Sequence, residues 1–292
     1  MNDAERRVWA RLPEGTRESL AALSASDLQT LLLSVARTRA SRVRPADLLR
    51  RWREDRFVRP APSDPRTLAA LEARMWQLLP ADVEGVELSP VVPLGTCSAV
   101  TPQSQDRIVS TVRTAEVVSD STNALAIEAA DRRLRQPASG EVHLAACHRM
   151  LRAQRFPAGF GSHFRLFTLV SSARDTGSGT TEARLLIRHL GYWQRVLPPA
   201  VAPRLLYTIF DSPVLRERVV DTVLPVVPVV EQPEREHGRG YYVDAAIRIS
   251  AGGDEIGDGG FTTWTAQLMG NAKERCLVSC VSTERLAAAP RS

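Results

Sequence analysis

Apolar residues recur at three- and four-residue spacings between charged positions through the first 56 residues, as Leu28, Leu31 and Leu32 illustrate. This period is typical of amphipathic helices. We expect three short helices, the second beginning near Ser26 and the third at Pro45, which suits a first helical turn. The prolines of the stretch 60–65 remove backbone donors and cannot continue a helix. We therefore predict an N-terminal helical domain over 1–62 and a second domain over 66–292.

The second domain combines the three- and four-residue spacing of helices with the two-residue alternation of strands. The pattern predicts helices over 68–79, 124–134, 181–196 and 214–223, with shorter ones inside 259–269 and after residue 282. It predicts strands over 86–92, 108–111, 142–145, 163–170, 204–210, 240–249, 259–269 and 276–281. Because strands and helices follow one another without regular βαβ repetition, we expect an α+β fold, with a mainly antiparallel sheet flanked by helices.

Composition and charge narrow the class of protein. Of 292 residues, 43% are hydrophobic and 24% charged, enough for a sizeable core. Lys273 is the only lysine among 38 basic residues, and the arginines alternate with acids, so the net charge of +5 is weak evidence for nucleic acid. No apolar run reaches the roughly 18 residues of a membrane span, and no signal peptide is recognisable, so we expect a cytoplasmic protein without a membrane partner.

Four cysteines are few for this length, and none stands in a CxxC pair. Buried free thiols are therefore the simplest expectation. A zinc site that gathers Cys97, Cys147, His148, Cys276 and Cys280 is a poor alternative, because cysteines four apart on a strand make poor chelate geometry.

The segment 143–167 carries the clearest chemistry, a strand, a loop containing Gly159 and Gly161, and a second strand. Three arginines, Arg149, Arg152 and Arg165, fall on it, with His148 and His163 nearby. Such a cluster of cations suits a nucleoside triphosphate or an acidic substrate. A solvated basic hairpin without a ligand remains the alternative.

This hairpin resembles the second signature motif of class II aminoacyl-tRNA synthetases, particularly the histidyl type. The resemblance places Arg149 on the arginine that grips the α-phosphate of ATP. The ending 278–286 is similar to the third motif, with Arg285 on the γ-phosphate arginine. The segments 239–242 and 258–260 resemble the tyrosine-pair strand and glycine-rich turn, and 119–122 the amino-acid loop. The likeness covers residues 66–292 and implies a homodimer.

Several positions depart from that pattern. Leu151 and Leu166 replace glutamates of the second motif, and Leu169 stands where histidyl enzymes carry a glutamine. Cys280 and Ser282 replace glycines of the third motif, so close backbone approach to a nucleotide is compromised. We also expect no anticodon-binding domain after Arg285. These departures argue against a working tRNA synthetase.

The resemblance implies a set of site residues. Arg149 and Arg285 would be catalytic. ATP and Mg²⁺ would be bound by Arg149, Arg152, His163, Arg165, Glu182, Glu284 and Arg285. An amino-acid-like substrate would be bound by Arg113, Glu116, Asp120, Asn123, Tyr241 and Tyr242. For each acid, a helix cap or a surface position is the structural alternative. The two tyrosines would point to opposite faces of a strand, and Trp264 is expected in the core.

Two functions follow. In the first, the chain binds ATP and/or an amino-acid-like ligand and, if an enzyme, is a ligase that activates a carboxylate as an acyl-adenylate for an acceptor other than tRNA. In the second, it is an inactive regulatory or scaffolding subunit with a protein partner, resembling the regulatory subunit of ATP phosphoribosyltransferase. RNA binding by the N-terminal helices is a weaker third.

Overall fold

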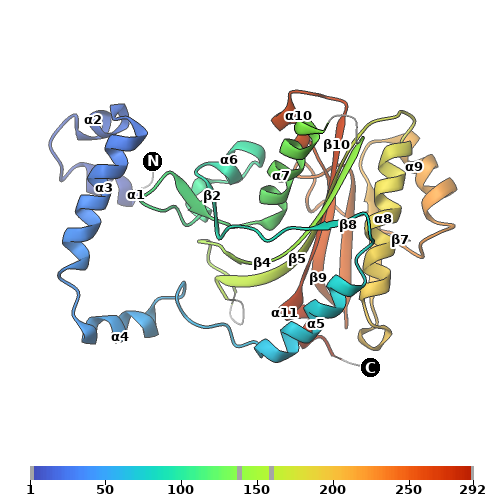
Figure 1. Ribbon diagram of the computed structural model, residues 1–292, viewed down its shortest axis with the longest axis horizontal. Coiled ribbons are helices and arrows are strands. Elements are labelled where there is room, and N and C mark those ends of the chain that lie inside the picture. Colours follow the sequence, from blue (N-terminus) through green and yellow to red (C-terminus); the bar gives the residue numbers. More distant parts are fainter. Residues whose placement is uncertain (1–2, 137–139, 158–160, 291–292) are drawn as a thin grey trace.

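The computed structural model describes residues 3–136, 140–157 and 161–290. Gly159, one of the two predicted loop glycines, lies outside them. A large twisted sheet forms the body, and helices cover both of its faces (Figure 1). The described helices are α1 (Asp3–Trp9), α2 (Thr16–Ala22), α3 (Ala25–Ala40), α4 (Pro45–Glu54), α5 (Pro65–Gln77), α6 (Thr96–Val100), α7 (Ser121–Arg135), α8 (Thr180–Val196), α9 (Pro213–Arg218), α10 (Trp264–Met269) and α11 (Thr283–Ala288).

The main sheet has eight strands in the order β1-β4-β5-β10-β9-β8-β6-β7. Its strands are β1 (Glu84–Gly85), β4 (Glu141–Leu151), β5 (His163–Arg174), β6 (Arg204–Ile209), β7 (Val230–Glu231), β8 (Val243–Ala251), β9 (Asp254–Thr262) and β10 (Glu274–Ser282). A separate pair joins β2 (Val91–Pro93) and β3 (Ala115–Val117). Among the described strands, only the two-residue edge strands β1 and β7 pair in parallel, so the predicted α+β class with a mainly antiparallel sheet is confirmed.

Side chains alternate between the two faces of the sheet, and each face has its own cover. On one face, Phe167 and Leu277 pack with α5 and α8 in the larger core cluster. On the other, Val170 and Val278 pack with α7 and α10 in the second cluster. Trp264 belongs to this second cluster and is 2% exposed, as predicted. We call the first the α8 face and the second the α7 face.

A chain of hydrogen bonds crosses the α8 face. The Trp193 indole donates to Ser279 Oγ at 2.8 Å, which leaves the Ser279 hydroxyl to donate to His189 Nδ1, also at 2.8 Å. His189 Nε2 then donates to Ser171 Oγ at 2.9 Å. Ser171 in turn donates to Nδ1 of His143 at 2.8 Å. This direction satisfies every member only with both imidazoles neutral.

The chain ends at the Glu141 carboxylate, 2.9 Å from His143 Nε2. A glutamate, a histidine and a serine in sequence also suggest nucleophilic catalysis. Ser171 is only 1% exposed, however, and is bonded on its second side by His189. The chain therefore fastens α8 to the sheet and has no access to a substrate.

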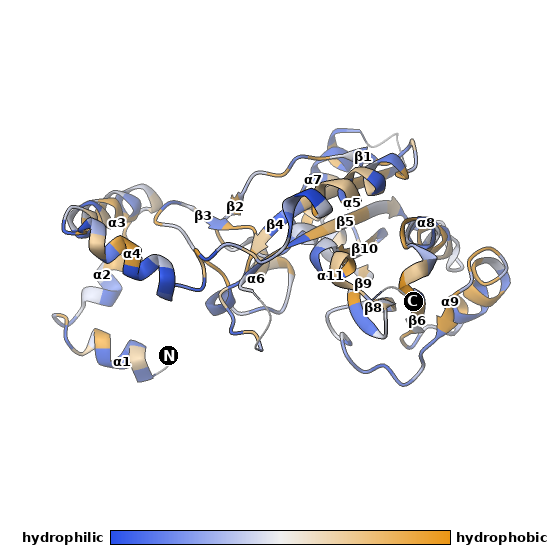
Figure 2. Cartoon of the chain, turned by 90° about the horizontal axis from the view of Figure 1, so that it is seen from below, coloured by the Kyte–Doolittle hydropathy of each residue, from blue (hydrophilic) through white to orange (hydrophobic). Residues whose placement is uncertain are grey.

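The N-terminal helices differ from this body. None of the described residues of α1–α4 is buried, and the four helices lie apart from the sheet (Figure 2). Leu48 and Leu49 of α4 are 58% and 52% exposed. The prediction of three helices was wrong by one, since α1 and α2 are separate, with Gly15 at a φ of 78° before α2. No described helix is both long and apolar enough to cross a bilayer.

Of the remaining element predictions, four differ from the structure. The strand predicted over 86–92 is wrong for most of its length, because β1 ends at Gly85 and β2 begins at Val91. Ser24, two residues before the predicted start, caps α3, while Pro45 begins α4 as predicted. The predicted strand over 108–111 is wrong, because only an isolated bridge forms there, at Ser110. The helix predicted over 214–223 is α9 followed by a π-helical turn, Val219–Val223. The domain boundary at 60–65 stays a prediction.

Candidate functional site

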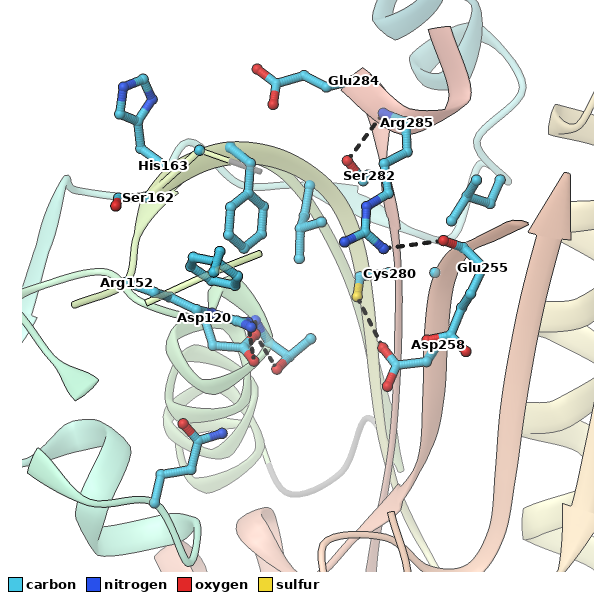
Figure 3. A pocket seen from close by; sticks show the side chains of 18 of the residues that line it. Asp120, Arg152, Ser162, His163, Glu255, Asp258, Cys280, Ser282, Glu284 and Arg285 are labelled. Carbon is cyan, nitrogen blue, oxygen red and sulfur yellow. Dashed lines mark hydrogen bonds and ion pairs between the residues drawn. The ribbon is translucent and has the colours of Figure 1, made fainter. Parts of the chain in front are cut away.

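A cavity of about 960 Å³ opens on the α7 face, between the β4–β5 hairpin, β9, β10 and the segment before α5 (Figure 3). Its lining combines acids, arginines, histidines and aromatic rings. The polar members are Arg56, Arg59, Ser63, Gln103, Asp120, Thr122, Arg152, Ser162, His163, His237, Arg239, Tyr241, Tyr242, Glu255, Asp258, Ser282, Glu284 and Arg285. The volume is that of a site for a metabolite or nucleotide.

Asp120 and Arg152 form one wall. Asp120 is the N-cap of α7 and accepts from the Thr122 amide at 2.9 Å, so the capping alternative for this acid is correct. Its second oxygen lies 3.3 Å from Arg152 Nη2. The Arg152 guanidinium also donates to the Ser119 carbonyl at 2.8 Å and lies 5.2 Å from the Phe164 ring centroid. The arginine is thus fixed in the cavity with much of its fork engaged.

Tyr241 and Tyr242 both line the cavity, which corrects the prediction that they point to opposite faces. They precede β8 instead of lying in it, because both amides donate to the Gly238 carbonyl in a tight turn. Their rings meet edge to face with centroids 4.9 Å apart. A Cβ on Gly260 would stand 2.6 Å from the Tyr242 ring, so only glycine allows this approach.

Asp258 lies on β9 at the floor of the cavity. The Tyr242 hydroxyl donates to its Oδ2 at 3.0 Å, and the Cys280 thiol lies 3.7 Å from its Oδ1. Burial raises the pKa of Asp258, and the Tyr242 hydrogen bond partly opposes that shift. Burial also raises the pKa values of Tyr242 and Cys280 well above their ordinary values, so both neighbours are neutral.

Arg285 reaches the cavity from α11. Its backbone amide is capped by Ser282 Oγ at 3.3 Å, and its Nη1 donates to the Glu255 carbonyl at 3.1 Å. The side chain is therefore directed at the cavity, as the labelled sticks of Figure 3 show.

Arg149 does not join Arg285 in this cavity. Arg149 and Arg165 stand opposite each other in the β4–β5 register, on the α8 face. Arg149 pairs with Glu284 at 2.9 Å, and Arg165 pairs with Glu72 of α5, also at 2.9 Å. Like charges directly opposite repel, and the two carboxylates neutralise them. The prediction that Arg149 and Arg285 line one cavity is therefore wrong. Arg149 touches the cavity lining through its ion pair with Glu284, the neighbour of Arg285 in the sequence.

Other predicted residues lie elsewhere. Glu182 pairs with Arg275 at 2.6 Å at the start of α8. Glu116 is 1% exposed and accepts from the Gly95 and Cys97 amides, and Asn123 is bonded to Cys97. Arg113 is exposed on the loop before β3. None of these predicted residues lines the cavity. Glu182, Glu116 and Asn123 are each used in a local structural contact.

Sequence reasoning missed the contribution of the segment before α5. Arg56 donates to the Gln154 carbonyl at 2.8 Å and to Ser162 Oγ at 2.7 Å. His163 Nε2 donates to the Arg59 carbonyl at 2.6 Å, and its Nδ1 accepts from Arg149 at 2.9 Å. No spacing in the sequence indicates contacts 97 to 106 residues apart. Asp258 lies in the segment 258–260 that the resemblance singled out, and the β9–β10 register places it opposite Cys280.

The cysteines are free thiols, three of them buried. Within the described ranges, no group of three or more histidine, cysteine, aspartate or glutamate side chains could hold a metal ion. Cys280 is the one described cysteine that lines the cavity. Its neutral thiol is a weak donor and a poor nucleophile.

The cavity can therefore hold a ligand with charge of both signs. Arginine forks suit phosphate or carboxylate groups, and Asp120 and Asp258 suit ammonium groups. Arg56 donates only to neutral oxygens in its hydrogen bonds with described residues, so its charge attracts anions to the hairpin end of the cavity.

Comparison with solved structures identifies the fold. The chain is similar to apo histidyl-tRNA synthetase of S. aureus, at a TM-score of 0.62 and 14% identity over 80% of this chain and 68% of that one. It is similar to an ATP phosphoribosyltransferase regulatory subunit/histidyl-tRNA synthetase from Bacillus halodurans, at 0.61 and 9% over 78% and 80%. A pyrrolysyl tRNA synthetase of Desulfitobacterium hafniense matches at 0.50 and 13%, over 82% and 69%.

These likenesses confirm the class II synthetase-like fold that the motifs suggested. No protein-family model matches the sequence, and no curated protein matches it either. At such low identity the likeness concerns the fold, and any activity must be argued from the cavity itself.

Proposed function

We propose that this chain binds ATP together with an amino-acid-like carboxylate in the α7-face cavity, as a class II synthetase-like paralogue that acts without tRNA. One observation carries the proposal: Asp120, Arg152 and Arg285 line a single cavity with the tyrosine pair. Guanidinium forks match phosphate and carboxylate geometry, and the N-cap acid suits an ammonium group. Because Arg149 is held by Glu284, we assign phosphate recognition to Arg152 and Arg285.

If the chain is an enzyme, the substrate carboxylate is its own nucleophile. A carboxylate oxygen would attack the α-phosphorus of ATP, the acyl-phosphate bond would form and pyrophosphate would leave. Arg152 and Arg285 would stabilise the negative charge that develops on the phosphate oxygens. Mg²⁺ would enter on the nucleotide phosphates, and Glu284 is the one predicted magnesium acid at the cavity rim.

The regulatory or scaffolding function is the second candidate. The Arg149–Glu284 pair favours it, because the arginine at the α-phosphate position serves a structural contact there. The likeness to the B. halodurans protein, named in part as a regulatory subunit, supports it too. Under this function we expect a protein partner, and under either we propose a homodimer.

Isothermal titration with Mg-ATP tests the assignment. We expect the parent protein to bind, Arg285→Ala to weaken binding by about 10- to 100-fold, as loss of a charged hydrogen-bond donor does, and Arg149→Ala to change it less than about threefold. Arg149→Ala should instead lower the melting temperature, because Glu284 loses its partner. Absence of heat in the parent protein rejects nucleotide binding, and equal losses in both variants reject the roles given to the two arginines.

Pyrophosphate exchange into ATP over an amino-acid panel separates the two functions. The enzyme function predicts exchange with at least one amino acid and no effect of added tRNA. The regulatory function predicts none, together with intact binding in the calorimeter.

A further inference from the structure

No described cationic side chain contacts Asp258. The Arg235 guanidinium, which donates to the His237 and Ile247 carbonyls, only partly opposes the raised pKa of Asp258 through space. Arg248 stands directly opposite Asp258 in the β8–β9 register but pairs with Glu255, 3.0 Å away. The donors on Asp258 are the neutral Tyr242 hydroxyl at 3.0 Å and the neutral Cys280 thiol at 3.7 Å. Across the three described stretches of chain, no arginine, lysine or histidine forms an ion pair with this carboxylate.

Such a placement is costly for the protein alone. A carboxylate removed from water without a cationic partner loses solvation that neutral donors restore only in part. If its task were only to orient Tyr242, a neutral amide would accept the same hydrogen bond without a charge. The cavity in front of Asp258 is open, so a cation carried by a ligand would complete the missing ion pair.

A second carboxylate shares the cavity. Asp120 lies near enough to disfavour ionisation of Asp258 by repulsion, so the two acids act on the same space. Asp120 is already paired with Arg152 at 3.3 Å, whereas Asp258 forms no ion pair with a described residue. Figure 3 shows the two acids on different sides of the cavity, one from the start of α7 and one from β9.

We propose that the amino-acid-like ligand of this cavity is a basic amino acid, whose side-chain ammonium or guanidinium pairs with Asp258. The proposal rests on the proposed function, in which Asp120 receives the α-ammonium group. Asp258 is then the residue that selects the side chain. L-Lysine and L-arginine carry the required second cation, whereas norleucine and citrulline have similar lengths without it.

Calorimetric titration with these four amino acids and L-histidine at pH 7.5, in the presence of Mg-ATP, tests the proposal. We expect L-lysine or L-arginine to bind at least tenfold more tightly than its neutral counterpart, the range of one charged hydrogen bond. Asp258→Asn should abolish this preference and keep the melting temperature, since an amide oxygen still accepts from Tyr242. Asp254→Asn, on an exposed acid of the same strand, should change neither.

Three results overturn the proposal. The first is equal binding of a basic amino acid and its neutral counterpart, and the second is tighter binding of L-histidine. The third is a preference that survives in Asp258→Asn. If Mg-ATP binds but none of the five amino acids does, the proposal fails while the nucleotide part of the proposed function stands. If Mg-ATP also produces no heat, both fail.

Discussion

The buried hydrogen-bond chain on the α8 face predicts that the protein loses stability in mild acid. Burial lowers the pKa of His143 to about 4, and it lowers the pKa of the fully buried His189 well below 6.5. Protonation of His143 would place a second proton on Nδ1, where Ser171 donates. His143 therefore binds a proton less readily in the folded state than in the unfolded chain.

The sign and size follow from proton linkage. Between pH 6.5 and about 4 the unfolded chain binds the proton on His143 and the folded chain does not, so the free energy of unfolding falls as pH falls through this window. His143 is only 8% exposed, so solvent screening is small. The full shift corresponds to about 3 kcal/mol, of which about 2 kcal/mol is lost between pH 7.5 and 5.

The assay is urea unfolding followed by tryptophan fluorescence at pH 7.5 and pH 5. His143→Gln should remove about 2 kcal/mol of the pH dependence, because glutamine can accept from Ser171 and donate to Glu141 but does not titrate. His237→Gln, on an exposed histidine, is the matched control and should keep the parent slope. An unchanged slope in His143→Gln would refute the neutral, directional chain.

Two further predictions concern packing. Glu274→Gln should lower the free energy of unfolding by about 3–5 kcal/mol in urea, because Arg133 is only 4% exposed and would lose the charge partner that it contacts at 2.9 Å. Replacing both residues by methionine should recover most of that loss. Gly260→Ala should lower the melting temperature and weaken Mg-ATP and amino-acid binding together, because the new Cβ would stand 2.6 Å from the Tyr242 ring. The control Gly191→Ala, in α8, should leave stability unchanged or raise it. A stable, fully binding Gly260→Ala protein would show that the tyrosine turn is not fixed by this contact.

The periodic signals of the sequence determine most of the fold. The helices over 65–77 and 180–196 and the long strands of the hairpin are specified by local apolar spacing. The short strand predicted over 108–111 failed because its pairing with β3 is limited to one isolated bridge, between Ser110 and Glu116, which is too short for a continuous ladder. The predicted orientation of Tyr241 and Tyr242 was also wrong. Gly238 and Gly240, at φ values of 91° and 85°, turn the chain before β8 begins.

The cavity was only half predictable. Asp120, Arg152 and Arg285 follow from motif order, and all three line it. The motif match could not say on which face of β4 the arginine falls, because a one-residue offset in a strand exchanges the two faces. The contacts of Arg56 with the hairpin depend on how the N-terminal segment returns to the body, which no local pattern encodes.

The facing pair of arginines in the β4–β5 hairpin bears on how descent should be judged among distant proteins of this shape. An amino acid can persist through divergence because a neighbouring helix depends on it, long after the chemistry that first required it has gone. An identical residue at a motif position then indicates a structural requirement of the fold and not a retained activity. Inheritance of an activity would have to be traced through the orientation of the side chain, not through the letter in the sequence.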